Sequence, residues 1–333
     1  MKAEAAKQER DLRNYILKKF DRDFIKELRQ LKPFRTIISF THIWASIILS
    51  LILINIVLLD FGFESIVYLL PLSIFIATRQ NALAVQVHEA SHYHLFKSRS
   101  LNDLFCNIFA SYWILNDVKS YRKNHLEHHR YLHTSKDPDK DLYHISTRKP
   151  NKYSLISIWM KDLLLITAIS RIIKYLKLDR KKDRINFFEL SLGLLIKLIT
   201  QTIIFLTFYI SYDFLHSLIL WISFWIFPLF CLYPLIIRIR TVAEHYHYNN
   251  KEGNNFISRT TKGNIFINYL LGACMEYHFE HHLLPHIPHY NLSTLNYRLL
   301  HHTNYSNETK LNLKNKFINK GYLNYWNNLL NIF

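Results

Sequence analysis

The sequence predicts an all-α integral membrane protein with four transmembrane helices in two hairpins. Three observations lead to this fold class: long apolar runs, basic residues concentrated on one side of those runs, and three histidine-rich motifs that lie outside them. Half of the 333 residues are hydrophobic. About 20 apolar helical residues, each rising about 1.5 Å, cross a hydrocarbon core of about 30 Å. We therefore expect spans at about residues 36–59, 65–87, 187–210 and 214–237.

The second and fourth apolar runs continue beyond the membrane. The run that starts at Ile66 is followed without a break by the first histidine motif, so one helix should carry His88 on its projecting end. The fourth run likewise leads through Arg238 to His245. Both helices should therefore leave the membrane on the same side and deliver histidines there.

The distribution of basic residues predicts the orientation. The links Asp60 to Glu64 and Ser211 to Ser217 contain no Lys or Arg, whereas the N-terminal segment, the stretch from Lys97 to Arg184 and the tail contain nearly all of them. Cytoplasmic loops of membrane proteins carry an excess of Lys and Arg. We therefore expect both termini and all three histidine motifs to face the cytoplasm.

The net charge of +17 is then mainly a topology signal. Anionic lipid headgroups are the expected partners of the basic segments. Nucleic acid is not expected, because no basic, aromatic-rich module stands apart from the spans. The first 31 residues lack the apolar core of a cleavable signal peptide, so the first span should serve as the anchor. We expect a multi-pass protein of the plasma membrane in a bacterium, or of the endoplasmic reticulum in a eukaryote.

No internal repeat or flexible linker divides the chain, so we expect one domain at 36–300, between a cytosolic amphipathic segment at 1–35 and a cytosolic tail at 301–333. Two segments, Leu101–Leu115 and Ser154–Ile169, are too short or too interrupted to span and should lie at the interface. In the N-terminal segment, basic residues alternate with apolar ones, as is typical of a helix on a membrane surface. The basic residues are Arg10, Arg13, Lys18 and Lys19, and the apolar ones are Leu12, Ile16, Leu17 and Phe20. Cys106, Cys231 and Cys274 are unclustered and are expected to be reduced.

Eight histidines occur in three motifs with helical spacing. The motifs are His88-Glu-Ala-Ser-His92, His125-Leu-Glu-His-His129 and His278-Phe-Glu-His-His282, with His128 and His281 inside the last two. Residues three and four apart share one face of a helix, and neutral imidazole is a good ligand for zinc, copper or iron. Because a single divalent ion rarely takes more than about six donors, eight clustered histidines indicate two metal ions.

Two other function classes fit parts of this pattern. His88-Glu-Ala-Ser-His92 satisfies the H-E-x-x-H signature of zinc metalloproteases, in which Glu89 would activate water. That interpretation leaves the other two motifs without a role. A transporter is disfavoured because the histidines lie outside the spans and only Lys197 is ionisable near the middle of one.

The motifs and their flanks resemble the membrane fatty acid desaturase family from the first span to about Leu300. The resemblance lies in the three motifs with Leu95-Phe-Lys97, Leu101-Asn-Asp-Leu104, Asp137-Pro-Asp139, Arg238 to His245, and Leu283-Leu-Pro285 with Ile287-Pro288. It implies a cytosolic cap that holds two non-haem irons. It also implies an O₂-dependent reaction that inserts a double bond into an acyl chain. It also implies a ninth ligand, His245.

The carboxylates and the other histidines near the motifs are not expected to be metal ligands. Five carboxylates are candidates for fixing imidazole tautomers, although a surface salt bridge is an equally good interpretation of each. They are Glu127, Asp137, Asp139, Glu244 and Glu280. Seven further histidines do not extend the motifs and are not expected to bind metal. They are His94, His133, His247, His286, His289, His301 and His302.

An unactivated C–H bond offers no handle for acid or base catalysis, so the expected chemistry needs an oxidant formed from O₂ at metal. A hydroxylase or ketolase on the same scaffold remains an alternative, because the ligand set is the same. The substrate would be an acyl lipid or an acyl thioester. No cytochrome-like segment is recognisable, so electrons should come from a separate donor of the ferredoxin or cytochrome b5 type that docks on the basic face.

Overall fold

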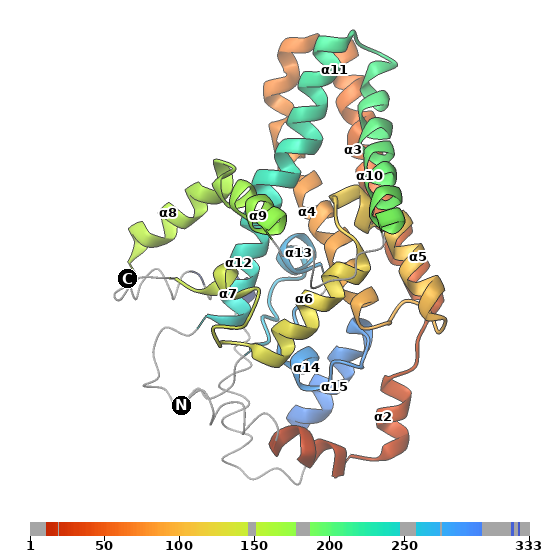
Figure 1. Cartoon of the computed structure of the whole chain (residues 1–333), viewed down its shortest axis with the longest axis vertical. Helices are drawn as coiled ribbons and strands as arrows, with labels where there is room; N and C mark the ends of the chain where they lie inside the picture. Colours follow the sequence, from red (N-terminus) through yellow and green to blue (C-terminus); the bar gives the residue numbers. More distant parts are fainter. Residues whose placement is uncertain are drawn as a thin grey trace.

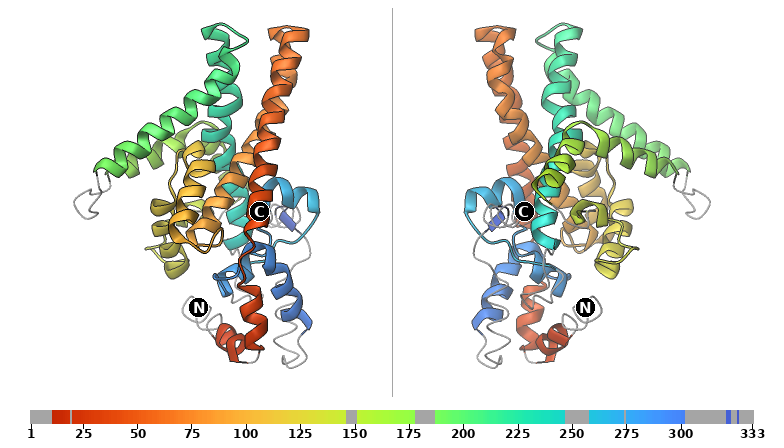
Figure 2. Two further views of the ribbon diagram at one scale, coloured as in Figure 1. Left: turned by 90° about the vertical axis from the view of Figure 1, so that its right-hand side faces the viewer. Right: turned by 90° about the vertical axis from the view of Figure 1, so that its left-hand side faces the viewer.

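The described parts of the computed structural model consist of helices and the turns and loops that connect them, without a β-strand. The described residues are 11–18, 20–145, 151–177, 187–246, 258–273, 275–301, 321–322 and 326. The molecule is elongated, with long helices at one end and shorter helices gathered at the other (Figures 1 and 2).

Four helical segments are long and apolar enough to cross a membrane, which confirms the predicted all-α membrane fold. They are α3 (Pro33–Phe61), α4 (Ile66–Ser91), α10 (Phe187–Tyr209), and a continuous segment from α11 (Phe214–Trp221) to α12 (Tyr233–His245). Pro33 suits the first turn of α3 because its missing N–H would have no partner there. Gly62 ends the helix with a φ of 80°, a conformation that glycine adopts without strain.

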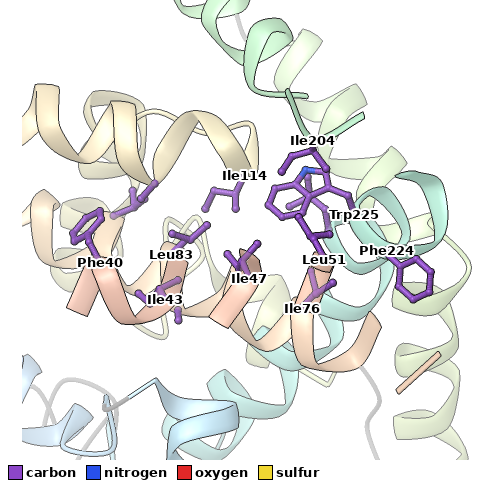
Figure 3. Packing of buried hydrophobic residues seen from close by; sticks show 14 of the residues in the cluster. Phe40, Ile43, Ile47, Leu51, Ile76, Leu83, Ile114, Ile204, Phe224 and Trp225 are labelled. Atoms are coloured by element: carbon purple, nitrogen blue, oxygen red, sulfur yellow. The ribbon is translucent and has the colours of Figure 1, made fainter. Parts of the chain in front are cut away.

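One face of α3 forms the core between the long helices. Phe40, Ile43, Ile47, Leu51 and Ile54 recur at helical spacing and are buried. They belong to one cluster with side chains of α4, α10 and the π-helical region that follows α11 (Figure 3). The burial of several large side chains at roughly 1.5–3 kcal/mol each makes this cluster a principal source of stability.

The opposite face of α3 is apolar and exposed. Its exposed side chains are Ile37, Ile38, Ile48, Leu49, Ile52, Leu53, Ile56 and Leu59. A surface this apolar is unfavourable in water but suits a hydrocarbon solvent. The long helices therefore bury one side against each other and present the other side to lipid.

Two π-helical stretches interrupt the last long segment, at Ile222–Ile226 and Pro228–Leu232. Pro228 and Pro234 have no backbone N–H and their rings crowd the preceding turn, so neither can make the usual α-helical bond. Widened turns accommodate such residues without ending the helix. The segment consequently continues to His245, eight residues beyond the predicted end of the span at 237.

The shorter helices surround the ends of α4 and α12. They are α2 (Arg22–Leu28), α5 (Arg99–Phe109), α6 (Val118–Tyr131), α7 (Lys140–Tyr143), α8 (Lys152–Leu163), α9 (Ile166–Lys177), α13 (Ile265–Ile267), α14 (His278–Leu283) and α15 (His289–His301). Side chains at the N-caps of α5, α6 and α8 accept bonds from otherwise unpaired backbone N–H groups; the capping residues are Ser98, Asp117 and Asn151.

Both segments predicted to lie at the interface are helical and expose apolar side chains. In the first, α5 exposes Leu101, Leu104, Ile108 and Phe109. The second is two helices rather than one, because Leu165 adopts a φ of 64° between α8 and α9. Its exposed side chains include Ile156, Met160, Leu164 and Ile169, and α9 continues beyond the predicted segment with exposed Ile172 and Ile173.

The N-terminal segment departs from its predicted place on a membrane surface. Leu12, Ile16 and Phe20 are buried, and they pack with α15 and the residues around the third histidine motif. Three of the four apolar residues that suggested lipid contact are therefore covered by protein, whereas Leu17 is exposed. An amphipathic pattern alone does not distinguish these two apolar surroundings. Arg10 and Lys19 lie outside the described residues.

A buried ion pair, absent from the sequence-based expectations, fastens α8 to α12. The side chain of Asp162 is fully buried and contacts both Arg238 Nε and Arg238 Nη2, the latter at 2.9 Å. Arg238 Nη1 also donates to the carbonyl oxygen of Asp141, at 2.9 Å. One guanidinium thus joins α12 to both α7 and α8.

Asp162→Ala should lower the free energy of unfolding by about 3–5 kcal/mol, because it leaves the Arg238 charge buried without its partner. The double variant Asp162→Leu/Arg238→Met, which removes both charges, should recover most of that loss. Denaturant unfolding of the purified protein in detergent measures both. An Asp162→Ala protein as stable as wild type would show that the pair does not hold α8 in place.

Candidate metal centre

Four helices deliver the predicted histidines to one place. His88 lies in the last turn of α4, and His92 is the residue that caps this helix. The helix α6 contributes the second motif, α12 ends at His245, and α14 consists largely of the third motif. All nine rings lie in one continuous cluster, with centroid separations such as 4.3 Å between His88 and His125.

The first group of converging donor atoms comes from α4, α6 and α14. Ring nitrogens of His88, His92, His125 and His281 all lie within 4.8 Å of one another. His129 joins this group, because its Nε2 lies 2.9 Å from His125 Nε2 and 3.1 Å from His281 Nε2.

The second group comes from α6, α12 and α14. Ring nitrogens of His128, His245 and His282 also lie within 4.8 Å of one another. His278 Nε2 lies 2.9 Å from His245 Nε2 and 3.1 Å from His282 Nε2. The stacked rings of His129 and His282, with centroids 4.2 Å apart, join the two groups.

These nitrogen–nitrogen distances suit metal coordination better than hydrogen bonding. A neutral imidazole nitrogen carries either one hydrogen or one lone pair, yet His125 Nε2 lies 2.9 Å from both His92 Nε2 and His129 Nε2. Two nitrogens at right angles on one ion with bonds of about 2.1 Å are about 3.0 Å apart. His88 Nε2 is buried and has no hydrogen-bond partner among the described residues.

Burial keeps these imidazoles uncharged. It lowers the pKa of His92 to about 3 and the pKa values of His125, His129, His278, His281 and His282 well below their usual range, with neighbouring histidines lowering most of them further. A neutral imidazole has a free lone pair, which a metal ligand needs. These six rings are therefore in the ligating protonation state at neutral pH.

His128 is oriented by Asp137, one of the five carboxylates that the sequence analysis proposed for this role. Its Nδ1 lies 3.0 Å from Asp137 Oδ1, and Tyr143 donates its hydroxyl hydrogen to Asp137 Oδ2. Burial opposes the charge on His128, but Asp137 and Asp139 outweigh it and raise the pKa of this ring. With Nδ1–H donating to Asp137, the lone pair of His128 is on Nε2, facing the second group.

The other four carboxylates proposed to fix imidazole tautomers have different surroundings. Asp139 accompanies Asp137 in the same turn, where its backbone N–H donates to Asp137 Oδ1. Glu280 accepts hydrogen bonds from Thr260 and Asn296 rather than from a histidine, and burial raises its pKa to about 7. Glu244 is fully buried beside His278. Glu127 is half-buried, and no hydrogen bond joins it to the nine histidines within the described residues.

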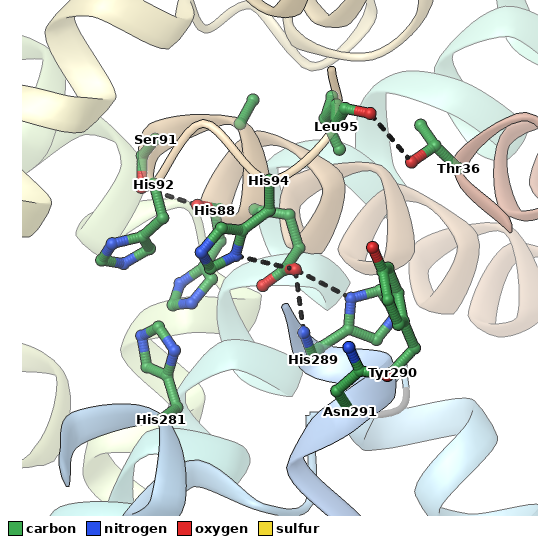
Figure 4. A network of polar contacts seen from close by, with 12 residues as sticks. Thr36, His88, Ser91, His92, His94, Leu95, His281, His289, Tyr290 and Asn291 are labelled. Atoms are coloured by element: carbon green, nitrogen blue, oxygen red, sulfur yellow. Dashed lines mark hydrogen bonds and ion pairs between the residues drawn. The ribbon is translucent and has the colours of Figure 1, made fainter. Parts of the chain in front are cut away.

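Glu89 has a role that sequence reasoning missed. Its Oε2 lies 3.1 Å from His94 Nδ1 and accepts a bond from the backbone N–H of His289 at 3.0 Å, so it joins α4 to the start of α15 (Figure 4). These two histidines, excluded as ligands, instead hold this carboxylate. Glu89 Oε1 has no hydrogen-bond partner among the described residues, and neither donor group includes an oxygen of Glu89.

The remaining histidines lie outside both groups. His133 follows the end of α6 at Tyr131 and adopts a φ of 63°, so it does not continue the helical face that carries His129. His286 is exposed and His301 stacks on Tyr297. His247 and His302 lie outside the described residues, as does Cys274, whereas Cys106 and Cys231 are buried free thiols.

Asp137→Asn should weaken metal binding by roughly 10- to 100-fold, the usual effect of losing a partner that orients a ligand. Metal analysis of the purified protein after equilibrium dialysis measures the change. Glu127→Gln, an acidic residue on α6 without such a contact, is the matched control and should bind metal like wild type. Equal metal content in both variants would show that Asp137 does not orient His128.

Comparison with known proteins places the nine histidines within a family match. The fatty acid desaturase family model matches residues 64–310, which include all nine histidines. A curated relative, dihydrorhizobitoxine desaturase of Bradyrhizobium elkanii, is 28% identical over 246 residues, covering 66% of this chain and 65% of the relative. No solved structure matches significantly. Because the family model spans most of the chain, the protein belongs to the fatty acid desaturase family, and four of its helical segments are long and apolar enough to cross a membrane.

Proposed function

We propose that the protein is a membrane desaturase that uses two histidine-bound irons and O₂ to insert a double bond into an acyl lipid or acyl thioester. The observation that carries this proposal is the convergence of nine imidazoles, six of them buried and three half-buried, in two groups where α4 and α12 end. Imidazole suits iron, and the family supports an oxidative reaction on a lipid.

The two irons would supply the oxidising power that removal of hydrogen from unactivated carbon requires. The protein provides the surroundings for that chemistry. Burial keeps six of its imidazoles neutral, and Asp137 fixes the ring of His128. The nine nitrogens, divided as five and four, would leave coordination positions open. Burial of the cluster also keeps bulk water away from the reacting carbons.

The position of the cluster supports an arrangement in which the substrate's acyl chain comes from the membrane. His88 and His245 stand at the ends of two long apolar segments, and the interfacial helices α5 and α9 expose apolar side chains. We propose that this end, with both termini, faces the cytoplasm, as the charge distribution predicts. The family domain would then comprise about residues 36–300, with the cap formed by the shorter helices.

The outer face of α6 supports docking of a separate electron donor. Lys119, Lys123 and Arg130 are exposed on this helix, whereas its inner face carries three of the histidines. A basic surface steers an acidic partner, so a ferredoxin or a cytochrome b5-type protein would reach the metal centre by the short path through α6.

Two alternatives share the same site. A hydroxylase or ketolase would use the same ligands. The relative's name denotes a desaturase of dihydrorhizobitoxine, which makes a substrate other than a fatty acyl lipid the second candidate. Mass spectrometry of extracts from cells expressing the protein, compared with empty-vector cells, distinguishes these products by a loss of two hydrogens or a gain of oxygen.

His128→Ala and His281→Ala should each abolish product formation, because each removes a ligand from one of the two groups, while membrane insertion persists because the spans fold without metal. His133→Ala should retain most of its iron and activity, whereas His245→Ala should be depleted of iron and inactive. Iron content of purified protein and product yield in cells are the measurements. Normal yield from His128→Ala or His281→Ala would refute the proposed function.

Reporter fusions should place both the N-terminus and the C-terminus in the cytoplasm, because four spans return the chain to its starting side. A reporter in the link between α3 and α4 should lie on the opposite side. Ends on opposite sides would mean that one of the four apolar segments does not cross the membrane.

A further inference from the structure

The second group of histidines has a carboxylate beside it whose two oxygens differ in surroundings. Glu244 is the penultimate residue of α12 and is fully buried. Its Oε1 accepts bonds from Arg240 Nε at 2.9 Å and from the Tyr322 hydroxyl at 3.0 Å. Its Oε2 has no hydrogen-bond partner among the described residues.

The unpaired oxygen faces the histidines. Glu244 Oε2 lies 3.6 Å from His278 Nε2, which is too long for a hydrogen bond. Donor atoms of Glu244, His245 and His278 nevertheless lie within 4.8 Å of one another. A nitrogen and an oxygen bound to one ion at about 2.1 Å each are about 3.6 Å apart when the angle between the bonds is about 120°. A metal ion would also compensate an otherwise unfavourable buried carboxylate oxygen.

Tyr322 comes from a segment beyond the family match, which ends at residue 310. Within the described residues, this segment is seated on the body of the protein at three points. The Tyr322 side chain is fully buried, Gly321 N–H donates to the Lys262 carbonyl at 3.1 Å, and Trp326 Nε1 donates to the Ile239 carbonyl at 3.0 Å. The segment thus brings a hydroxyl group to the carboxylate that borders the metal centre.

We propose that Glu244 is an oxygen ligand of the second metal position and that Tyr322, together with Arg240, holds it in the ligating orientation. The proposal rests on the proposed function, because it requires metal at the histidine cluster. It makes the two positions unlike: five imidazoles form the first, whereas four imidazoles and one anionic oxygen form the second. Tyr322 is a positioning residue, since it touches the carboxylate and not the metal.

The test uses the full-length protein in detergent, with Fe²⁺ added under anaerobic conditions. Equilibrium dialysis with metal analysis gives the affinity for each ion, and Mössbauer spectroscopy with ⁵⁷Fe reports the surroundings of each iron separately. Wild type should bind two ions and show two different iron signals. Glu244→Gln and Glu244→Ala should keep one ion at the wild-type affinity and bind the other at least about 100-fold more weakly, with one signal unchanged.

Tyr322→Phe should weaken binding of that same ion by roughly tenfold, as expected for a partner outside the coordination sphere. Trp326→Phe removes a different contact of the same segment and should leave both affinities unchanged. Glu280→Gln, a buried carboxylate bonded to Thr260 and Asn296, should likewise retain both ions. These controls separate a role of Glu244 from general loosening of the segment or the third motif.

Each result has one meaning. Two ions with wild-type affinities and unchanged signals in Glu244→Gln and Glu244→Ala would overturn the proposal while leaving the proposed function intact. Loss of both ions together from a Glu244→Gln protein that still unfolds cooperatively would overturn it too, because the effect would not be specific to one position. A wild-type protein that fails to bind two irons would instead refute the proposed function.

Discussion

The rest of the structure depends on bringing nine imidazoles, six of them buried and three half-buried, to the junction of four helices. Burying so many nitrogen atoms is unfavourable unless each finds a partner, and charging them in this cluster would be still less favourable. Rings that burial keeps neutral are good metal ligands. Burial therefore makes the metal-free cluster unfavourable and at the same time prepares it to bind metal. Other features of the cap, including the carboxylates and the packing of the N-terminal segment, can be understood as ways of holding this cluster together.

The helix α4 connects the two environments of the molecule. Its first half is apolar and lies among the long helices, whereas its second half carries buried polar side chains. Asn81 donates to the Leu271 carbonyl at 2.8 Å, and Gln80 donates to the Trp225 carbonyl at 3.1 Å. These bonds join α4 to segments near the third motif and in the last span. The position of His88 relative to α12 and α14 is therefore set by polar contacts as well as by apolar packing.

The buried aspartates and glutamates have different roles because their surroundings differ. Asp137 orients a ring, and Glu89 links two helices through histidines that are not in either donor group. Asp162 pairs with an arginine at a distance from the cluster. Glu244 has one bonded oxygen and one unpaired oxygen, and the unpaired oxygen lies 3.6 Å from His278 Nε2. Residue type and proximity to a motif would not have distinguished these four roles.

The sequence by itself determined the features that depend on neighbouring residues. Apolar runs of sufficient length predicted the four long helices, and spacings of three and four residues predicted which histidines share a helical face. The place of His245 came from the family resemblance, supported by the continuation of an apolar helix. Tertiary structure decided the contacts between distant segments: Glu89 with His289, Asp162 with Arg238, and Tyr322 with Glu244. It also placed Ile16 and its apolar neighbours in the N-terminal segment against protein instead of lipid. Helical periodicity specifies that a face is apolar or polar, but its partner is selected by packing of the whole chain, for which local sequence contains no signal.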